Sequence, residues 1–101
     1  MYEHVFKLLA AVPDHTGHAG YWLNELRRII AHLDDGTMMS APLSERVRPQ
    51  WIELVFKTRS TMKQHDFEER LRSEVLPAVE FALPSGYLPV AVHIMHSIKL
   101  A

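Results

Sequence analysis

The stretch Trp51-Ile52-Glu53-Leu54-Val55-Phe56-Lys57-Thr58 decides the fold, because its conformation sets the order of the other elements. Every second residue is apolar or β-branched, and the segment is rich in aromatic and β-branched side chains, which favours a strand. A helix that begins at Gln50 is the alternative, since several positions also recur at helical spacing: Trp51, Leu54, Val55 and Thr58. We interpret residues 51–58 as a strand.

Toward the N-terminus, the pattern predicts a strand, a helix and a second, short strand. Even positions from Tyr2 to Val12 are mostly apolar, which is typical of a strand. The turn at residues 13–17 leads into a helix over 19–33, whose apolar residues follow the spacing of one buried face: Ala19, Trp22, Leu23, Leu26, Ile29, Ile30 and Leu33. Gly36 ends this helix, and a short strand is expected around Thr37 to Ala41, before a connection rich in Pro, Ser and Arg.

Toward the C-terminus, the pattern predicts one helix and a final strand. Apolar positions mark an amphipathic helix over 67–82, which Pro77 must kink or restart. Thr61 with Gln64, or Asp66 with Glu69, can form a capping box at its start. After a turn at residues 84–87, alternation over 88–100 predicts the last strand.

These elements predict one α+β domain that spans residues 1–101, with the ferredoxin-like order β-α-β-β-α-β. In this fold two helices cover one face of a four-stranded antiparallel sheet. Even-numbered residues of the first, third and last strands are expected to face the helices, and the odd-numbered residues to form the opposite face.

The composition limits the chemistry that is available. The chain has no cysteine, which excludes disulfides, thiolate catalysis, iron–sulfur clusters and cysteine-bound zinc. We expect a cytoplasmic protein, because the N-terminus lacks the basic region of a signal peptide and no run of about 18 apolar residues indicates a membrane span. The formal net charge of −1 argues against a dedicated polyanion-binding protein.

The odd-numbered sheet face is too apolar for a surface that only meets water. Its charged residues are interspersed with apolar ones, and we expect the latter to form the interface of a homodimer: Val5, Leu9, Trp51, Val55 and Met95. A ligand or another protein that covers this face is the alternative.

The turn before the first helix is a candidate anion site. Backbone N–H groups at a helix start attract anions, and small residues let an anion approach; the expected site comprises Thr16, Gly17, His18 and Gly20. His15 and His18, with Asp14, have a spacing that can ligate a metal, but no further ligands cluster with them, so we predict no metal and no cofactor. An ordinary capped turn is the alternative.

Three residues are weak candidates for proton transfer: His93, His15 and Glu53. A histidine near a carboxylate can titrate around neutral pH, and His93 and Glu53 are both expected on the odd-numbered face. His96 is expected on the other face, so that His93 and His96 cannot chelate one metal ion.

A basic segment surrounds the third strand. Between Ser44 and Lys63, five basic residues against two acidic ones give a local charge of +3. Four of these cations form a candidate surface for a protein partner or a nucleic acid, with Trp51 available to stack on a base: Arg46, Arg48, Lys57 and Arg59. Solvated, salt-bridged charges are the alternative.

Together these patterns favour a small homo-oligomeric interaction domain with a regulatory or accessory role and a protein partner, and not an enzyme. Two alternatives stay open. One is a dimeric ferredoxin-like enzyme that acts on a small anionic metabolite. The other is nucleic-acid binding through the region from Arg46 to Arg59.

Overall fold

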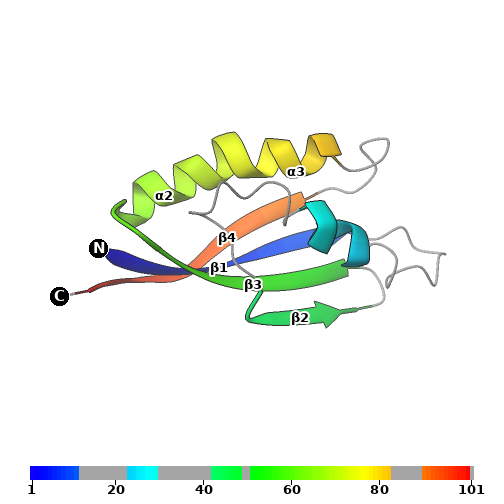
Figure 1. Ribbon diagram of the computed structural model, residues 1–101, viewed down its shortest axis with the longest axis horizontal. Coiled ribbons are helices and arrows are strands. Elements are labelled where there is room, and N and C mark those ends of the chain that lie inside the picture. The colour runs from blue at the N-terminus through cyan, green and yellow to red at the C-terminus, as the bar shows by residue number, and fades with distance from the viewer. Residues whose placement is uncertain (12–22, 30–41, 49–50, 83–89, 101) are drawn as a thin grey trace.

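The computed structural model of the protein describes residues 1–11, 23–29, 42–48, 51–82 and 90–100, and the structural statements below concern these residues. Four strands, β1 (Tyr2–Ala11), β2 (Ser44–Val47), β3 (Trp51–Ser60) and β4 (Val90–Lys99), form one sheet in the order β2-β3-β1-β4 (Figure 1). Every neighbouring pair is antiparallel. The predicted four-stranded antiparallel sheet is therefore confirmed.

The decisive stretch 51–58 lies within β3, so the helical alternative is wrong. β3 pairs with β1 over its whole length, from Ala11 opposite Trp51 to Tyr2 opposite Ser60. Its even-numbered apolar side chains are buried and its odd-numbered ones are exposed or half-buried, which is the alternation of a strand covered on one face.

The helices lie on one face of this sheet. Residues 23–29 are helical, and α2 (Gln64–Arg70), the π-helical turn η1 (Leu71–Val75) and α3 (Leu76–Ala82) follow one another without a break, above β1 and β4 in Figure 1. The buried core lies between these layers and draws on both: Phe6, Leu8, Ala10, Leu26, Ile29, Ile52, Leu54, Phe56, Phe67, Leu71, Val79, Val90, Val92 and Ile94.

Pro77 accounts for the π-helical turn. Proline has no N–H, and in a regular helix its ring clashes with the carbonyl four residues earlier. Immediately before it, the N–H of Leu76 donates to the carbonyl of Leu71, five residues back, so the helix widens and α3 begins with Pro77 in its first turn. The predicted restart at Pro77 thus takes the form of a π-turn and not of a break.

Neither predicted capping box forms at the start of α2. The N-cap residue is Lys63, and no side chain caps the helix. Instead, the hydroxyl of Ser60 accepts a hydrogen bond from the N–H of Met62 at 2.9 Å and stabilises the turn that precedes the helix.

The second strand differs from the prediction. The expected segment 37–41 lies outside the described residues, and β2 occupies Ser44–Val47, within the segment that the sequence predicts to be a connection. Its alternating charges are typical of an edge strand, which is why apolar periodicity does not reveal it. Arg27 donates to Glu45 from Nε at 2.6 Å and also from Nη2, and these bonds hold the pKa of the Glu45 carboxyl below its ordinary value.

A β-bulge changes the register of β4. Val5 pairs with His96 whereas Phe6 pairs with Ile94, so Met95 is the extra residue. Beyond the bulge the alternation reverses, and Ile98 lies opposite Glu3 on the odd-numbered face. The prediction that His96 faces the helices is therefore wrong. The expected orientation of even-numbered residues holds for β1, for β3 and for β4 up to Ile94.

No helix within the described part of the chain combines the length and the apolar character that crossing a membrane requires.

Candidate functional site

The sheet face opposite the helices, hereafter the open face, is not covered by any described helix (Figure 1). It carries the odd-numbered residues of β1 and β3, and β4 contributes Met95, His96 and Ile98 as well as its odd-numbered residues before the bulge. Trp51 is 45% exposed, and Met95 and Ile98 are each 49% exposed. Three large apolar side chains are thus exposed on one face of the sheet, with Trp51 opposite Ala11 and Ile98 opposite Glu3, near the two ends of β1.

The predicted dimer residues all lie on this face. Val5 and Leu9 come from β1, the central strand of the three long ones, and Trp51 and Val55 come from β3 beside it. Met95 lies at the bulge of β4, on the other side of β1. The apolar residues thus extend across three adjacent strands.

One end of the open face is organised around Glu3. Its side chain is only 14% exposed, and its carboxylate lies 3.4 Å from Nζ of Lys57 and 3.5 Å from Nε of Arg59. Both cations project from β3, next to Glu3 on β1. Two of the four predicted partner-binding cations are therefore engaged by an acid of the same face.

The other acid of the face, Glu53, also has basic neighbours. Arg46 on β2 lies directly opposite Glu53. Lys7 on β1 is a diagonal neighbour, because Leu9 pairs with Glu53, and diagonal positions are within reach of long side chains. Arg48 follows β2 and is exposed. Each acid of the face thus lies next to basic residues of this segment in the sheet.

The candidate proton-transfer residues His93 and Glu53 do not meet. His93 is exposed on β4 opposite Lys7, whereas Glu53 lies on β3, and β1 runs between them. Two strand spacings of about 4.8 Å each separate the residues across the sheet, well beyond hydrogen-bond distance. The bulge brings His96 to the open face together with His93, which corrects the expectation that they point to opposite faces.

The predicted anion and metal site lies outside the described residues. This applies to His15, Thr16, Gly17, His18 and Gly20 alike. Within the described ranges, no group of three or more His, Cys, Asp or Glu residues is placed to hold a metal ion.

A buried histidine that sequence reasoning did not single out lies between the sheet and α2. His4 is fully buried; its Nε2 lies 3.0 Å from the carbonyl oxygen of Met62, and its Nδ1 lies 2.7 Å from the hydroxyl of Ser97. A carbonyl only accepts, so Nε2 carries the proton and Nδ1 accepts from Ser97. The ring also contacts Phe67, with centroids 4.2 Å apart.

This environment keeps His4 neutral. Burial lowers its pKa below the ordinary value, and the hydrogen bond to Met62 opposes this shift without reversing it. The even position of His4 in the first strand was the signal that could have revealed its burial.

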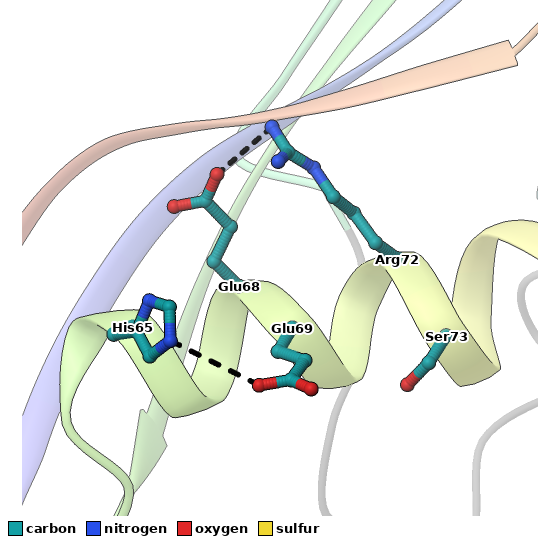
Figure 2. Close-up of a pocket in the computed structure, with 5 residues that line it drawn as sticks. All are labelled: His65, Glu68, Glu69, Arg72 and Ser73. Carbon is teal, nitrogen blue, oxygen red and sulfur yellow. Dashed lines mark ion pairs between the residues drawn. The ribbon is translucent and has the colours of Figure 1, made fainter.

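The outer surface of α2 and η1 contains a shallow pocket. Figure 2 shows its lining residues on successive turns of one helix: His65, Glu68, Glu69, Arg72 and Ser73. Glu68 pairs with Arg72 at 2.8 Å, and Glu69 lies 3.9 Å from Nε2 of His65, which is 89% exposed. These contacts are ordinary i,i+4 pairs on a solvated helix surface, and they do not assemble an enclosed catalytic site.

Neither the protein-family models nor the curated protein sequences contain a match to this chain.

Proposed function

We propose that this protein is a homodimeric interaction domain with a ferredoxin-like fold, in which the open faces of two copies pack together. The strand order β2-β3-β1-β4 with antiparallel neighbours is compatible with that fold. The observation that carries the proposal is the exposure of Trp51, Met95 and Ile98 on the face opposite the helices.

The size of the open face suits a second copy. Three strands of ten residues each contribute to it. At about 3.3 Å per residue and about 4.8 Å between strands, their flat projection covers roughly 475 Å² per copy. Two such projections amount to about 950 Å², and accessible surface exceeds a flat projection because it follows the side chains, so complete coverage would reach roughly the 1,000 Å² that a specific interface needs.

The two acids of the face also tolerate coverage. Glu3 has Lys57 and Arg59 beside it, and Glu53 has Arg46 and Lys7 beside it. A buried charge is costly mainly when it lacks a partner, so an acid with basic neighbours in its own face needs none from the second copy.

The role that follows is regulatory or accessory, with a protein partner at the surfaces that the dimer leaves exposed. We also infer a cytoplasmic location, because the chain has no cysteine. An enzymatic role has less support, since His93 and Glu53 lie on strands that β1 separates.

The test is the solution mass of the full chain and of Val55→Glu, measured by light scattering. Val55 lies on β3 in the middle of the open face, so an added charge there should convert a dimer into a monomer.

Phe81→Glu is the matched control, because it introduces the same charge on α3, where Phe81 is 92% exposed in the helical layer. It should remain dimeric. A native monomer, or a dimer that only Phe81→Glu dissociates, would contradict the proposal.

A further inference from the structure

The register of the sheet arranges the centre of the open face in three rows. Each row pairs a residue of β1 with a residue of β3: Val5 with Lys57, Lys7 with Val55, and Leu9 with Glu53. The two rows beside the middle one thus carry opposite charges, and each also carries an apolar residue of β1. Lys57 and Glu53 are four residues apart on one strand, about 13 Å, so they do not reach one another within a chain.

A second copy can cover this face in a small number of symmetric ways. Sheets that pack face to face in the aligned manner keep their strands within about 30° of one another. A two-fold axis in the contact then runs either across the strands or along them. With the axis across the strands at the middle row, each strand lies over its own copy in the opposite direction. Lys57 then faces Glu53 of the other copy, and Val5 faces Leu9.

An axis along the strands gives a poorer match. If it runs over β1, Glu3 faces its own copy and Glu53 faces an uncharged residue of β4, so that no described acid faces a cation. If it runs between β1 and β3, Val5 faces Lys57 and Leu9 faces Glu53, so that both apolar residues face charges. Only the axis across the strands places charge opposite charge and apolar opposite apolar.

Lys57 is able to reach the other copy. Its side chain is 47% exposed, and its Nζ lies 3.4 Å from the carboxylate of Glu3. An ammonium group has three donors, so Lys57 can keep Glu3 and also bind Glu53 across the contact. The axis does bring Lys7 to its own copy, and its flexible stem lets the two ammonium groups diverge.

We propose that the two copies pack with their strands antiparallel, and that Lys57 of each copy binds Glu53 of the other. This orientation rests on the proposed dimer and adds the contacts that select one arrangement of the two copies. The two ion pairs lie inside the contact, where salt screens them less than it screens the net repulsion between the faces.

The experiment reverses the charges of the pair. Lys57→Glu and Glu53→Lys are studied by sedimentation equilibrium, alone and mixed in equal amounts, and circular dichroism verifies that each is folded. Each variant alone sets like charges opposite one another and should raise the dissociation constant by about 10-fold or more. The mixture should return to within a few-fold of the native value, because the heterodimer regains two opposite-charge pairs.

Lys63→Glu is the matched control, because it makes the same change of charge at the start of α2, outside the open face, and should keep the native dissociation constant. Native dissociation constants for both single variants, or a mixture of folded variants that does not recover, would overturn the orientation and leave the dimer itself standing. A native monomer would overturn both.

A second measurement adds no charge to the face. The chain has no cysteine, so a single introduced cysteine can be joined only to its own copy. Val55→Cys lies on the axis and should be joined by a thiol reagent that spans about 10 Å, the distance between packed sheets. The two copies of Leu9→Cys are about 16 Å apart on opposite sides of the axis and should stay separate. Joining of Leu9→Cys and not of Val55→Cys would place the axis along β1 and overturn the proposed orientation.

Discussion

At the scale of single residues, the buried His4 shows how position in a strand sets the chemistry of a side chain. The histidines on the open face are exposed to water, whereas His4 is enclosed between Phe67, the Met62 carbonyl and the Ser97 hydroxyl. Ser97 donates to Nδ1 of the neutral ring and could accept from it if the ring were protonated, so burial of the ring, and not a lost hydrogen bond, is what disfavours the charged form.

We expect this residue to make the stability of the protein depend on pH. Burial lowers the pKa of His4 in the folded state, so the unfolded chain binds more protons at mildly acidic pH. The contribution of His4 to stability is complete at pH values above the pKa of histidine in the unfolded chain, which is about 6.5. It declines as the pH falls toward the lower pKa that His4 has in the folded state. Melting temperatures from about pH 8 to about pH 5 measure this decline.

The variant His4→Gln should flatten that pH profile, because glutamine keeps a donor and an acceptor but does not titrate. His65→Gln is the control, since His65 is 89% exposed on α2, and this variant should keep the native profile. A profile that is identical in the native chain and in His4→Gln would show that His4 is not responsible.

At the scale of elements, the helical segment 23–29 contributes to the core through one face. Leu26 is fully buried and Ile29 is 3% exposed, and both belong to the core cluster. The opposite side carries Arg27 and Arg28, which are paired with Glu45 and Glu25. The spacing in the sequence predicted this orientation, because apolar positions three and four apart fall on one side of a helix.

Leu26→Ala should therefore lower the free energy of unfolding by about 2–5 kcal/mol, through lost burial and a residual cavity. Urea unfolding measures the loss. Asn24→Ala is the control on the exposed side of the same segment and should cost much less, since Asn24 is exposed and its Oδ1 accepts a surface hydrogen bond from Arg27. Similar losses in the two variants would contradict the assigned buried side.

At the scale of the whole molecule, the salt dependence of binding at the open face distinguishes dimer formation from nucleic-acid binding. Four basic residues, Lys7, Arg46, Lys57 and Arg59, accompany two acids, Glu3 and Glu53, on this face. Two copies that face one another therefore repel modestly, whereas a polyanion is attracted to the same surface.

We predict that the dissociation constant of the proposed dimer falls as sodium chloride rises from about 50 mM to about 500 mM. The reason is that salt screens the repulsion between the two faces, and at the higher concentration its range is only a few Å. Sedimentation equilibrium measures the dissociation constant. Binding of a single-stranded oligonucleotide would weaken steeply over the same range. Alanine at all four of Arg46, Arg48, Lys57 and Arg59 should make the dissociation constant depend less on salt. A native dimer that dissociates at high salt would contradict this prediction.

Local periodicity was enough to predict the β3 strand, the apolar side of helix 23–29 and the burial of even-numbered residues in β1. Each depends on repeats of 2.0 or 3.6 residues that any reader of the sequence can count. The common face of Val5, Leu9, Trp51 and Val55 follows from the same alternation, which is why it was predictable from sequence.

Only the tertiary structure decided the features that depend on a partner strand or on residues far apart in the chain. β2 is held by its pairing with β3, and its charged residues carry no apolar repeat. The bulge at Met95 is a mismatch between β4 and β1, and it moves His96 to the open face. The contacts of His4 join β1 to Met62 and to Ser97 of β4. Local sequence determines which side of an element is apolar, but register and proximity arise only when the elements pack.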